Sequence, residues 1–243
     1  MSDPRTEELA QRLATVRGEL DAAVARAGRA PGDVELLVVT KFFPAADVAR
    51  LIELGEREFG ESREPEASRK IGELGSLVDG SGAVFDMIGS VQTKKAKTVA
   101  RWARSVHSVD RDKLVDQLAS AAGVALDEQV RSEPLGVFCQ VSLDDDPTRG
   151  GVVEGQLPEL AQRVADAPTL RLAGLMVIAP THGEVREWMA KTARIREKFL
   201  QEHPDATALS AGMSGDMAIA VEYGSTCVRV GTAIMGSRPI LSQ

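Results

Sequence analysis

The sequence predicts a single-domain (β/α)8 TIM barrel over residues 1–243, with one extra N-terminal helix. Short apolar segments alternate with charged, amphipathic segments along the chain, which is typical of right-handed βαβ units in a parallel sheet. Eight such units suit a compact barrel of this length, and no Gly-, Ser- or Pro-rich linker divides the chain. An open, doubly wound sheet is the alternative, because periodicity does not distinguish an open sheet from a closed one.

The first elements carry clear signals. In residues 6–27, apolar side chains recur at helical spacing up to Gly28, which predicts the extra helix. Residues 36–39 form a continuous apolar run, which is typical of a strand buried on both faces. Pro44 then starts a helix that we expect to end near Leu54.

The later elements follow the same alternation. Seven more strands are predicted at short apolar segments, in residues 58–60, 84–88, 105–109, 135–141, 170–178, 208–210 and 226–230. Helices are expected between them, in a charged segment ending near Leu74 and in residues 94–104, 111–122, 155–166, 184–201 and 216–223. We interpret the glycine-rich residues 72–82 as a surface loop.

Composition and charge exclude several classes of partner. A formal net charge of −7 argues against a general nucleic-acid binder or a protein of anionic membranes. We find no signal-peptide core and no apolar run of membrane-spanning length, so we expect a cytoplasmic protein without nucleic-acid or membrane partners. Cys139 and Cys227 lie in apolar segments, which favours core residues over a disulfide. The three histidines are far apart, and we expect no metal site.

Two glycine-bearing segments near the C-terminus are the most informative feature of the chain. Residues 209–216 read Leu-Ser-Ala-Gly-Met-Ser-Gly-Asp, residues 228–233 read Val-Arg-Val-Gly-Thr-Ala, and each follows a short apolar stretch. Small side chains, free backbone N–H groups and hydroxyls are the parts of an anion cradle at a helix N-terminus. In a (β/α)8 barrel, the loops after the seventh and eighth strands commonly form a phosphate site. These segments therefore indicate a ligand that carries a phosphate.

Lys41 is a second candidate for chemistry. It follows the first predicted strand, at the end of the barrel where active sites of this fold lie. A lysine there can form a Schiff base with a carbonyl compound, provided that desolvation or nearby cations lower its pKa. The alternative is a lysine that extends from a strand end into solvent and has no chemical role.

Arg229 stands within an apolar strand, two residues before Gly231. Arginine is rarely buried without a partner, so it forms either an inter-strand salt bridge or a donor aimed at a ligand. Pyridoxal 5′-phosphate (PLP) would match all three features: its aldehyde suits Lys41, its phosphate suits the glycine-bearing segments, and its ring nitrogen suits Arg229. Because arginine keeps its proton, it would leave the pyridine neutral and weaken the electron sink.

Several motifs together carry a resemblance to a known family. They are residues 37–41 with Pro44, 59–61, 88–89 with Gln92 and Lys95, 107–110, 174–176, 209–216 and 228–238. On these residues the chain resembles, over essentially its whole length, the YggS/PROSC family of PLP homeostasis proteins. The resemblance implies one barrel similar to the N-terminal domain of alanine racemase.

The resemblance also implies the residues of the site. In that family, the lysine matching Lys41 carries PLP as a Schiff base and the arginine matching Arg229 faces the ring nitrogen. The residues matching Ser210, Ser214, Gly231 and Thr232 lie in the phosphate region. The expected cofactor-binding residues are Lys41, Ser210, Met213, Ser214, Arg229, Gly231 and Thr232.

Three places depart from the family pattern. Ser62 stands where the family usually has Asn, Phe85 and Asp86 where it has Trp and His, and Lys94 where it has Asn. Ser62 keeps a hydrogen-bonding group with a shorter reach, whereas Asp86 introduces an anion. We expect PLP binding to persist, because the Schiff-base and phosphate groups are intact.

The resemblance implies a protein of intracellular PLP homeostasis that binds PLP reversibly and passes it to PLP-dependent enzymes, without enzymatic turnover. We expect a monomer. The alternative is a PLP-dependent enzyme similar to an amino-acid racemase. Racemases of this barrel type need a second acid/base, typically a tyrosine of a C-terminal β-domain. The sequence stops at Gln243 and its single tyrosine, Tyr223, falls in the last predicted helix, so we expect neither that domain nor a two-base mechanism.

Overall fold

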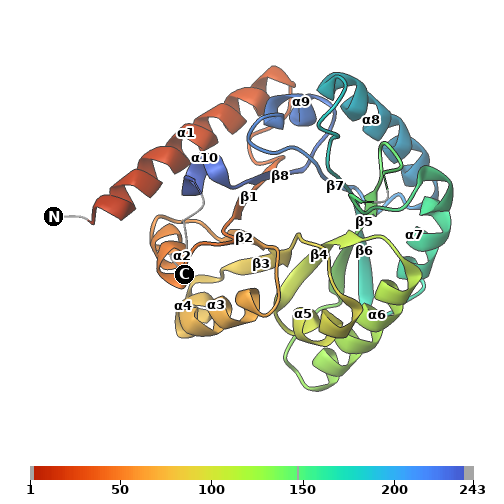
Figure 1. Ribbon diagram of the computed structural model, residues 1–243, viewed down its shortest axis with the longest axis horizontal. Helices are drawn as coiled ribbons and strands as arrows, with labels where there is room; N and C mark the ends of the chain where they lie inside the picture. The colour runs from red at the N-terminus through yellow and green to blue at the C-terminus, as the bar shows by residue number, and fades with distance from the viewer. Residues whose placement is uncertain (1–2, 147, 238–243) are drawn as a thin grey trace.

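The computed structural model describes residues 3–146 and 148–237, which form a closed barrel of eight parallel strands in chain order. Figure 1 shows the helices surrounding the ring of strands. The predicted closed barrel is therefore confirmed over the doubly wound sheet. The strands are β1 (Glu35–Val39), β2 (Glu58–Glu61), β3 (Val84–Met87), β4 (Ala103–Val109), β5 (Leu135–Val141), β6 (Leu170–Val177), β7 (Ala208–Ser210) and β8 (Cys227–Val230).

The helices follow the predicted alternation, with differences at short elements. They are α1 (Pro4–Arg26), α2 (Ala45–Glu53), α3 (Glu66–Leu74), α4 (Ser76–Ser81), α5 (Ala96–Trp102), α6 (Asp112–Asp127), α7 (Leu157–Ala165), α8 (Val185–Glu202), α9 (Met217–Glu222) and α10 (Thr232–Met235), with 3₁₀ turns η1 (Thr93–Lys95) and η2 (Glu154–Gln156). The interpretation of residues 72–82 as a loop was wrong, because α4 lies within them. Only Leu77 and Val78 of its six residues pack partly against the core, so α4 is too short to show a helical periodicity.

Helix α1 packs on the outside of the barrel, near β1 and β8, the two strands whose pairing closes the sheet. The Asp3 side chain accepts a hydrogen bond from the N–H of Arg5 at 3.3 Å, and Pro4 occupies the first helical turn, so the helix starts with its cap satisfied. One face is buried against α2, α9 and α10. That face consists of Leu9, Leu13, Val16, Leu20, Ala23 and Val24.

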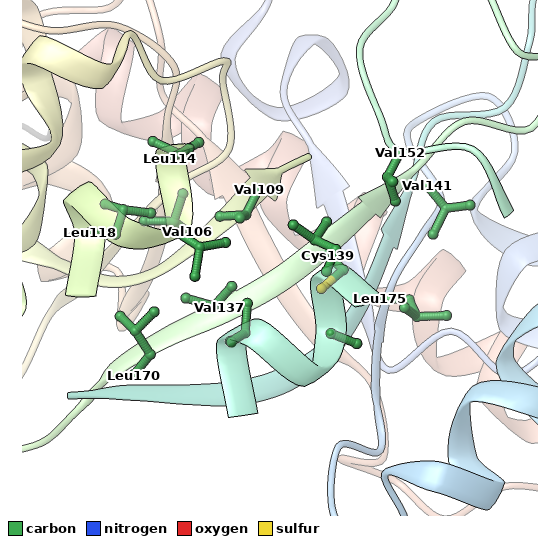
Figure 2. Packing of buried hydrophobic residues seen from close by; sticks show 14 of the residues in the cluster. Val106, Val109, Leu114, Leu118, Val137, Cys139, Val141, Val152, Leu170 and Leu175 are labelled. Carbon is green, nitrogen blue, oxygen red and sulfur yellow. The ribbon is translucent and has the colours of Figure 1, made fainter. Parts of the chain in front are cut away.

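The apolar core lies between the strands and the helices. Alternate residues of a strand point to opposite faces, and those that point outward pack against the helix layer. Figure 2 shows this for β4, β5 and α6, where Val106, Val137 and Leu118 belong to one cluster. Fully burying a side chain of this kind contributes roughly 1.5–3 kcal/mol. Cys139 in this cluster and Cys227 in β8 are buried free thiols, as expected.

The inside of the barrel is different, because much of it is polar. Phe138, Ala173 and Met176 form a small apolar cluster there. The buried polar residues Asp86, Ser105, His107, Ser210 and Arg229 come from β3, β4, β7 and β8 and contact one another by hydrogen bonds. This interior, together with the loops that follow the strands, positions the candidate site.

Candidate functional site

Lys41 lies just beyond the end of β1, at the carboxyl-terminal end of the barrel strands, as the sequence predicts. Its side chain is exposed, and Nζ lies 5.8 Å from the centroid of the Phe42 ring. Phe42 has a φ of 70°, a left-handed conformation that is unusual for a bulky residue and that concentrates at functional sites. Lys41 also lines a cavity of about 630 Å³, together with Glu61, Ser62 and Lys70.

The guanidinium of Arg229 is buried inside the barrel, with 5% of the residue exposed. Nη1 donates a hydrogen bond to Ser210 Oγ at 2.6 Å, and Nη2 donates to the carbonyl oxygen of Val177 at 2.9 Å. Burial lowers its pKa, since no carboxylate of the described residues forms a salt bridge with this cation. Within residues 3–146 and 148–237, the inter-strand salt bridge considered from the sequence is therefore not formed.

The pairing of β1 with β8 brings Gly231 toward Lys41. Leu37 lies opposite Arg229, so the chain beyond β8 runs beside the end of β1. A Cβ on Gly231 would lie 3.3 Å from the Cβ of Val39, which places this glycine against the last residue of β1. Gly231 and the exposed Thr232, the first residue of α10, thus lie at the same edge of the barrel as Lys41.

The loop after β7 approaches β8 from the other side. Its turn requires glycine: Gly212 has a φ of 94°, and a Cβ there would lie 2.7 Å from the Cβ of Ala220. The carbonyl oxygen of Gly212 accepts a hydrogen bond from the N–H of Arg229 at 2.9 Å. Met213 and Ser214 follow as exposed residues, and the N–H of Met213 donates to Asp216.

Backbone donors remain available in both loops. Among the described residues, no acceptor pairs with the N–H groups of Ser214 and Gly215, or with those of Thr232 and Ala233. Such groups are suited to an anion. Ser210, in contrast, is fully buried and hydrogen-bonded to Arg229. Of the predicted phosphate residues, Ser214 and Thr232 are therefore exposed, Gly231 is partly exposed and Ser210 lies in the interior.

Sequence reasoning did not identify the role of His107. Its Nδ1 lies 2.9 Å from Ser210 Oγ, and its Nε2 lies 3.0 Å from Ser105 Oγ. The Ser105 hydroxyl donates to Asp86 Oδ1 at 2.8 Å, and one face of the imidazole lies against Phe138, with ring centroids 4.1 Å apart. The signal that could have found it is the alternation on β4, where polar residues 105 and 107 flank the apolar residue 106.

Burial and neighbouring charges determine the protonation states of Asp86, His107 and Arg229 in the barrel interior. Burial alone would raise the pKa of Asp86, but the proximity of His107, whose Nε2 lies 3.6 Å from Oδ2, and the hydrogen bonds from Arg104 outweigh it and hold the pKa below its usual range. Burial lowers the pKa of His107, and outweighs the opposing effect of Asp86. At neutral pH the interior therefore contains an ionised Asp86, a neutral His107 and a charged Arg229.

The other two departures lie elsewhere. Ser62 lines the cavity beside Lys41, and Lys94 is exposed in η1. Tyr223 ends α9, at the side from which the chain enters β8, and therefore lies away from the carboxyl-terminal edge. Over residues 3–146 and 148–237, no three His, Cys, Asp or Glu side chains gather in a way that could hold a metal ion. Among the described helices, none is long and apolar enough to cross a bilayer.

Comparison with known proteins relates this arrangement to a family. Residues 13–239 match the family described as the alanine racemase N-terminal domain. The chain is 44% identical over 247 residues to the pyridoxal phosphate homeostasis protein of Mycobacterium tuberculosis, covering 98% of this chain and 96% of that protein. It is 43% identical over 227 residues to the protein of the same name from Corynebacterium glutamicum, covering 93% and 100%.

A solved structure agrees with these relatives. PipY of Synechococcus elongatus PCC7942, with PLP bound, is similar with a TM-score of 0.76 and 31% identity, covering 94% of this chain and 100% of that chain. The fold, the motifs and the identity over nearly the full length agree. The chain therefore belongs to the family of pyridoxal phosphate homeostasis proteins, which is built on the barrel of the alanine racemase N-terminal domain.

Proposed function

We propose that this protein binds PLP at the carboxyl-terminal end of the barrel, through Lys41, and serves intracellular PLP homeostasis as a carrier. The observation that carries the proposal is the buried guanidinium of Arg229, whose contacts among the described residues are neutral oxygens. A buried charge without a counter-charge is costly unless a ligand or a hydrogen-bond network compensates it. The ring nitrogen of PLP is an acceptor that a guanidinium in this position can satisfy.

The residues at the edge of the barrel fit the remaining parts of PLP. Bound PLP supplies an aldehyde, with which a primary amine condenses to a Schiff base and water. Lys41 provides an exposed amine beside a cavity, and the loops at Ser214 and Thr232 provide backbone donors and hydroxyls for a phosphate. Lys70 lines the same cavity, but its Nζ contacts Glu61 and donates to the carbonyl oxygen of Thr40 at 2.8 Å, so it is the less available amine.

Two features favour a carrier over an amino-acid racemase. Arg229 does not give up its proton, so it leaves the pyridine neutral and reduces the stabilisation of a carbanion. Tyr223 lies at the opposite side from Lys41, so it does not supply a second acid/base at the same site. A protein that binds PLP without turnover can limit free aldehyde and deliver the cofactor to PLP-dependent enzymes, which we propose as its partners.

Titration with PLP, followed by visible absorbance, tests this function. The wild-type protein should develop an absorbance band that saturates at one PLP per chain, and Lys41→Ala should lack it. Lys97→Ala, which removes an exposed lysine of α5, is the matched control and should keep the band. Retention of the band by Lys41→Ala would reject Lys41 as the attachment site.

Delivery of the cofactor is tested separately. The loaded protein, freed of unbound PLP, should restore activity to the apo form of a PLP-dependent enzyme. The control is free PLP, at the concentration that is in equilibrium with the loaded carrier. If the apoenzyme regains activity no faster with the carrier than with this control, the protein does not transfer PLP directly.

A further inference from the structure

A chain of hydrogen bonds crosses the barrel interior from β8 to β3. It runs through Arg229, Ser210, His107, Ser105 and Asp86, and every one of these residues is 5% exposed or less. It connects Arg229, the cation expected at the ring nitrogen of PLP, to the carboxylate of Asp86, which is one of the departures from the family pattern. Which atom donates and which accepts at each contact can be assigned by counting the hydrogens of these side chains.

The hydrogens can be assigned from the Asp86 end. Asp86 is ionised and only accepts, and the Ser105 hydroxyl donates its single proton to Oδ1. Ser105 Oγ must therefore accept at its other contact, so Nε2 of His107 carries a hydrogen. This assignment uses the geometry of three side chains and no assumption about a ligand.

The other half of the chain follows from the neutral imidazole. With its proton on Nε2, His107 has an unprotonated Nδ1 that accepts from the Ser210 hydroxyl. Ser210 Oγ is then free to accept from Nη1 of Arg229, which only donates. Every proton has one acceptor, so all four contacts are made simultaneously in one arrangement.

Both ends of the chain are anchored. Arg104 donates to Asp86 through Nε at 3.0 Å and also pairs with Glu35, which holds the carboxylate in place. At the other end, Val177 accepts from Nη2 of Arg229. These contacts use two of the five N–H groups of Arg229, so the guanidinium is held while the other donors remain for a ligand.

Resting on the proposed function, we propose that His107 is a positioning residue that acts through Ser210 to hold the Arg229 guanidinium toward the ring nitrogen of PLP. Ser105 and Asp86 select the His107 tautomer that makes this possible. With the other tautomer, the unprotonated Nε2 would face Ser105 Oγ, whose single proton is already donated to Asp86, so that contact would have no hydrogen. The identity of residue 86 thus bears on the cofactor contact without touching the cofactor.

The test compares PLP with 1-deazapyridoxal 5′-phosphate, in which a C–H group replaces the ring nitrogen. Dissociation constants of both ligands are measured for the wild-type protein, for His107→Phe and for Ser105→Ala. We expect the wild-type protein to prefer PLP, and each variant to lose about tenfold of that preference, because the contact of Arg229 with the nitrogen weakens. Affinity for the deaza ligand should change less than twofold, since that ligand lacks the acceptor.

Ser108→Ala is the matched control. It removes a hydroxyl from the same strand. This hydroxyl donates to the carbonyl oxygen of Gly89 at 2.6 Å and is not part of the hydrogen-bond chain from Arg229 to Asp86. It should leave the preference unchanged. Circular dichroism establishes that each variant is folded, and if His107→Phe is not, Ser105→Ala and Ser210→Ala decide the question.

Two results would overturn the proposal. Equal weakening of both ligands in the variants would assign His107 and Ser105 a purely structural role, and a wild-type protein that binds both ligands equally would show that Arg229 makes no contact with the nitrogen. Failure of the wild-type protein to bind PLP at all would reject the proposed function itself, and is recognised before any variant is compared.

Discussion

Nη1 of Arg229 donates a hydrogen bond to the hydroxyl of Ser210, 2.6 Å away, between the neighbouring strands β8 and β7. Both side chains are buried inside the barrel, so water does not weaken this contact. The sequence predicted both residues as ligands of one cofactor. In the proposed site the contact gives them different tasks: Arg229 would contact the ring nitrogen of PLP, and Ser210 would hold Arg229 in place.

The proposed phosphate contacts of the loops after β7 and β8 can be tested with two ligands that differ only in the phosphate. Replacing Ser214 or Thr232 with Leu should weaken PLP by about tenfold or more, because a charge-assisted hydrogen bond contributes about 1.5–3 kcal/mol. The affinity for pyridoxal should change little. Thr207→Leu, an exposed position before β7 at the other end of the barrel, serves as the control. Equal losses for PLP and pyridoxal would place the phosphate elsewhere.

Racemisation should be slow or absent. Incubated with L-alanine and PLP, the protein should convert it at a rate about 10²–10⁴-fold below that of a two-base enzyme, because one positioned acid/base group is missing. Chiral chromatography measures the D-isomer, and NMR measures deuterium exchange at Cα, which one base can support with retention. Rapid racemisation abolished by Lys41→Ala would make the protein an enzyme.

Acid should destabilise the protein through His107. Its pKa in the folded state lies below the unfolded value of about 6.5, so below that pH the unfolded state binds more protons. The free energy of unfolding should therefore fall as the pH decreases, by up to about 1.4 kcal/mol per pH unit from this group. Urea unfolding between about pH 7 and pH 5 measures the slope.

The variant His107→Phe should flatten that slope, whereas His182→Phe, at an exposed position, should not. A slope that is the same in the wild-type protein and in His107→Phe would contradict a buried neutral imidazole.

Gly174 in β6 is expected to tolerate no side chain. An added Cβ would lie 1.8 Å from the carbonyl oxygen of Ala208 in the adjacent strand β7, and the backbone there cannot shift without breaking the barrel pairing. Gly174→Ala should therefore lower the free energy of unfolding by more than about 3 kcal/mol. Gly155→Ala, where an added Cβ meets open space, should change it by less than about 1 kcal/mol. Similar stabilities for the two variants in thermal unfolding would contradict this packing.

Sequence patterns predicted the strands because most of their residues are buried, as in Leu36 to Val39 of β1. They failed where local chemistry gives little signal. The predicted helix 94–104 runs into β4, since Ala103 pairs with Phe85 of β3 and only that long-range contact separates helix from strand. The four-residue helix α10 was missed because it is too short for a periodic pattern.

In the candidate site, too, single residues could be predicted from the sequence but contacts between distant residues could not. Lys41 and Arg229 could be predicted because an amine at a strand end and an arginine in an apolar strand are visible one residue at a time. The partnership of His107 with Ser210 could not, because the two residues are 103 positions apart in the chain and meet only when the barrel closes. Asp86 was recognised as a departure, but its partners come from the next strand and were not evident.

Reduction with borohydride in the presence of PLP, followed by peptide mass spectrometry, identifies the lysine that holds the cofactor. We expect one phosphopyridoxyl group per chain, on the peptide containing Lys41. Lys70 lines the same cavity, but is held by Glu61 and Thr40 and should remain unlabelled. A label on Lys70 or another lysine, with Lys41 unmodified, would contradict the assignment of Lys41 as the residue that holds the cofactor.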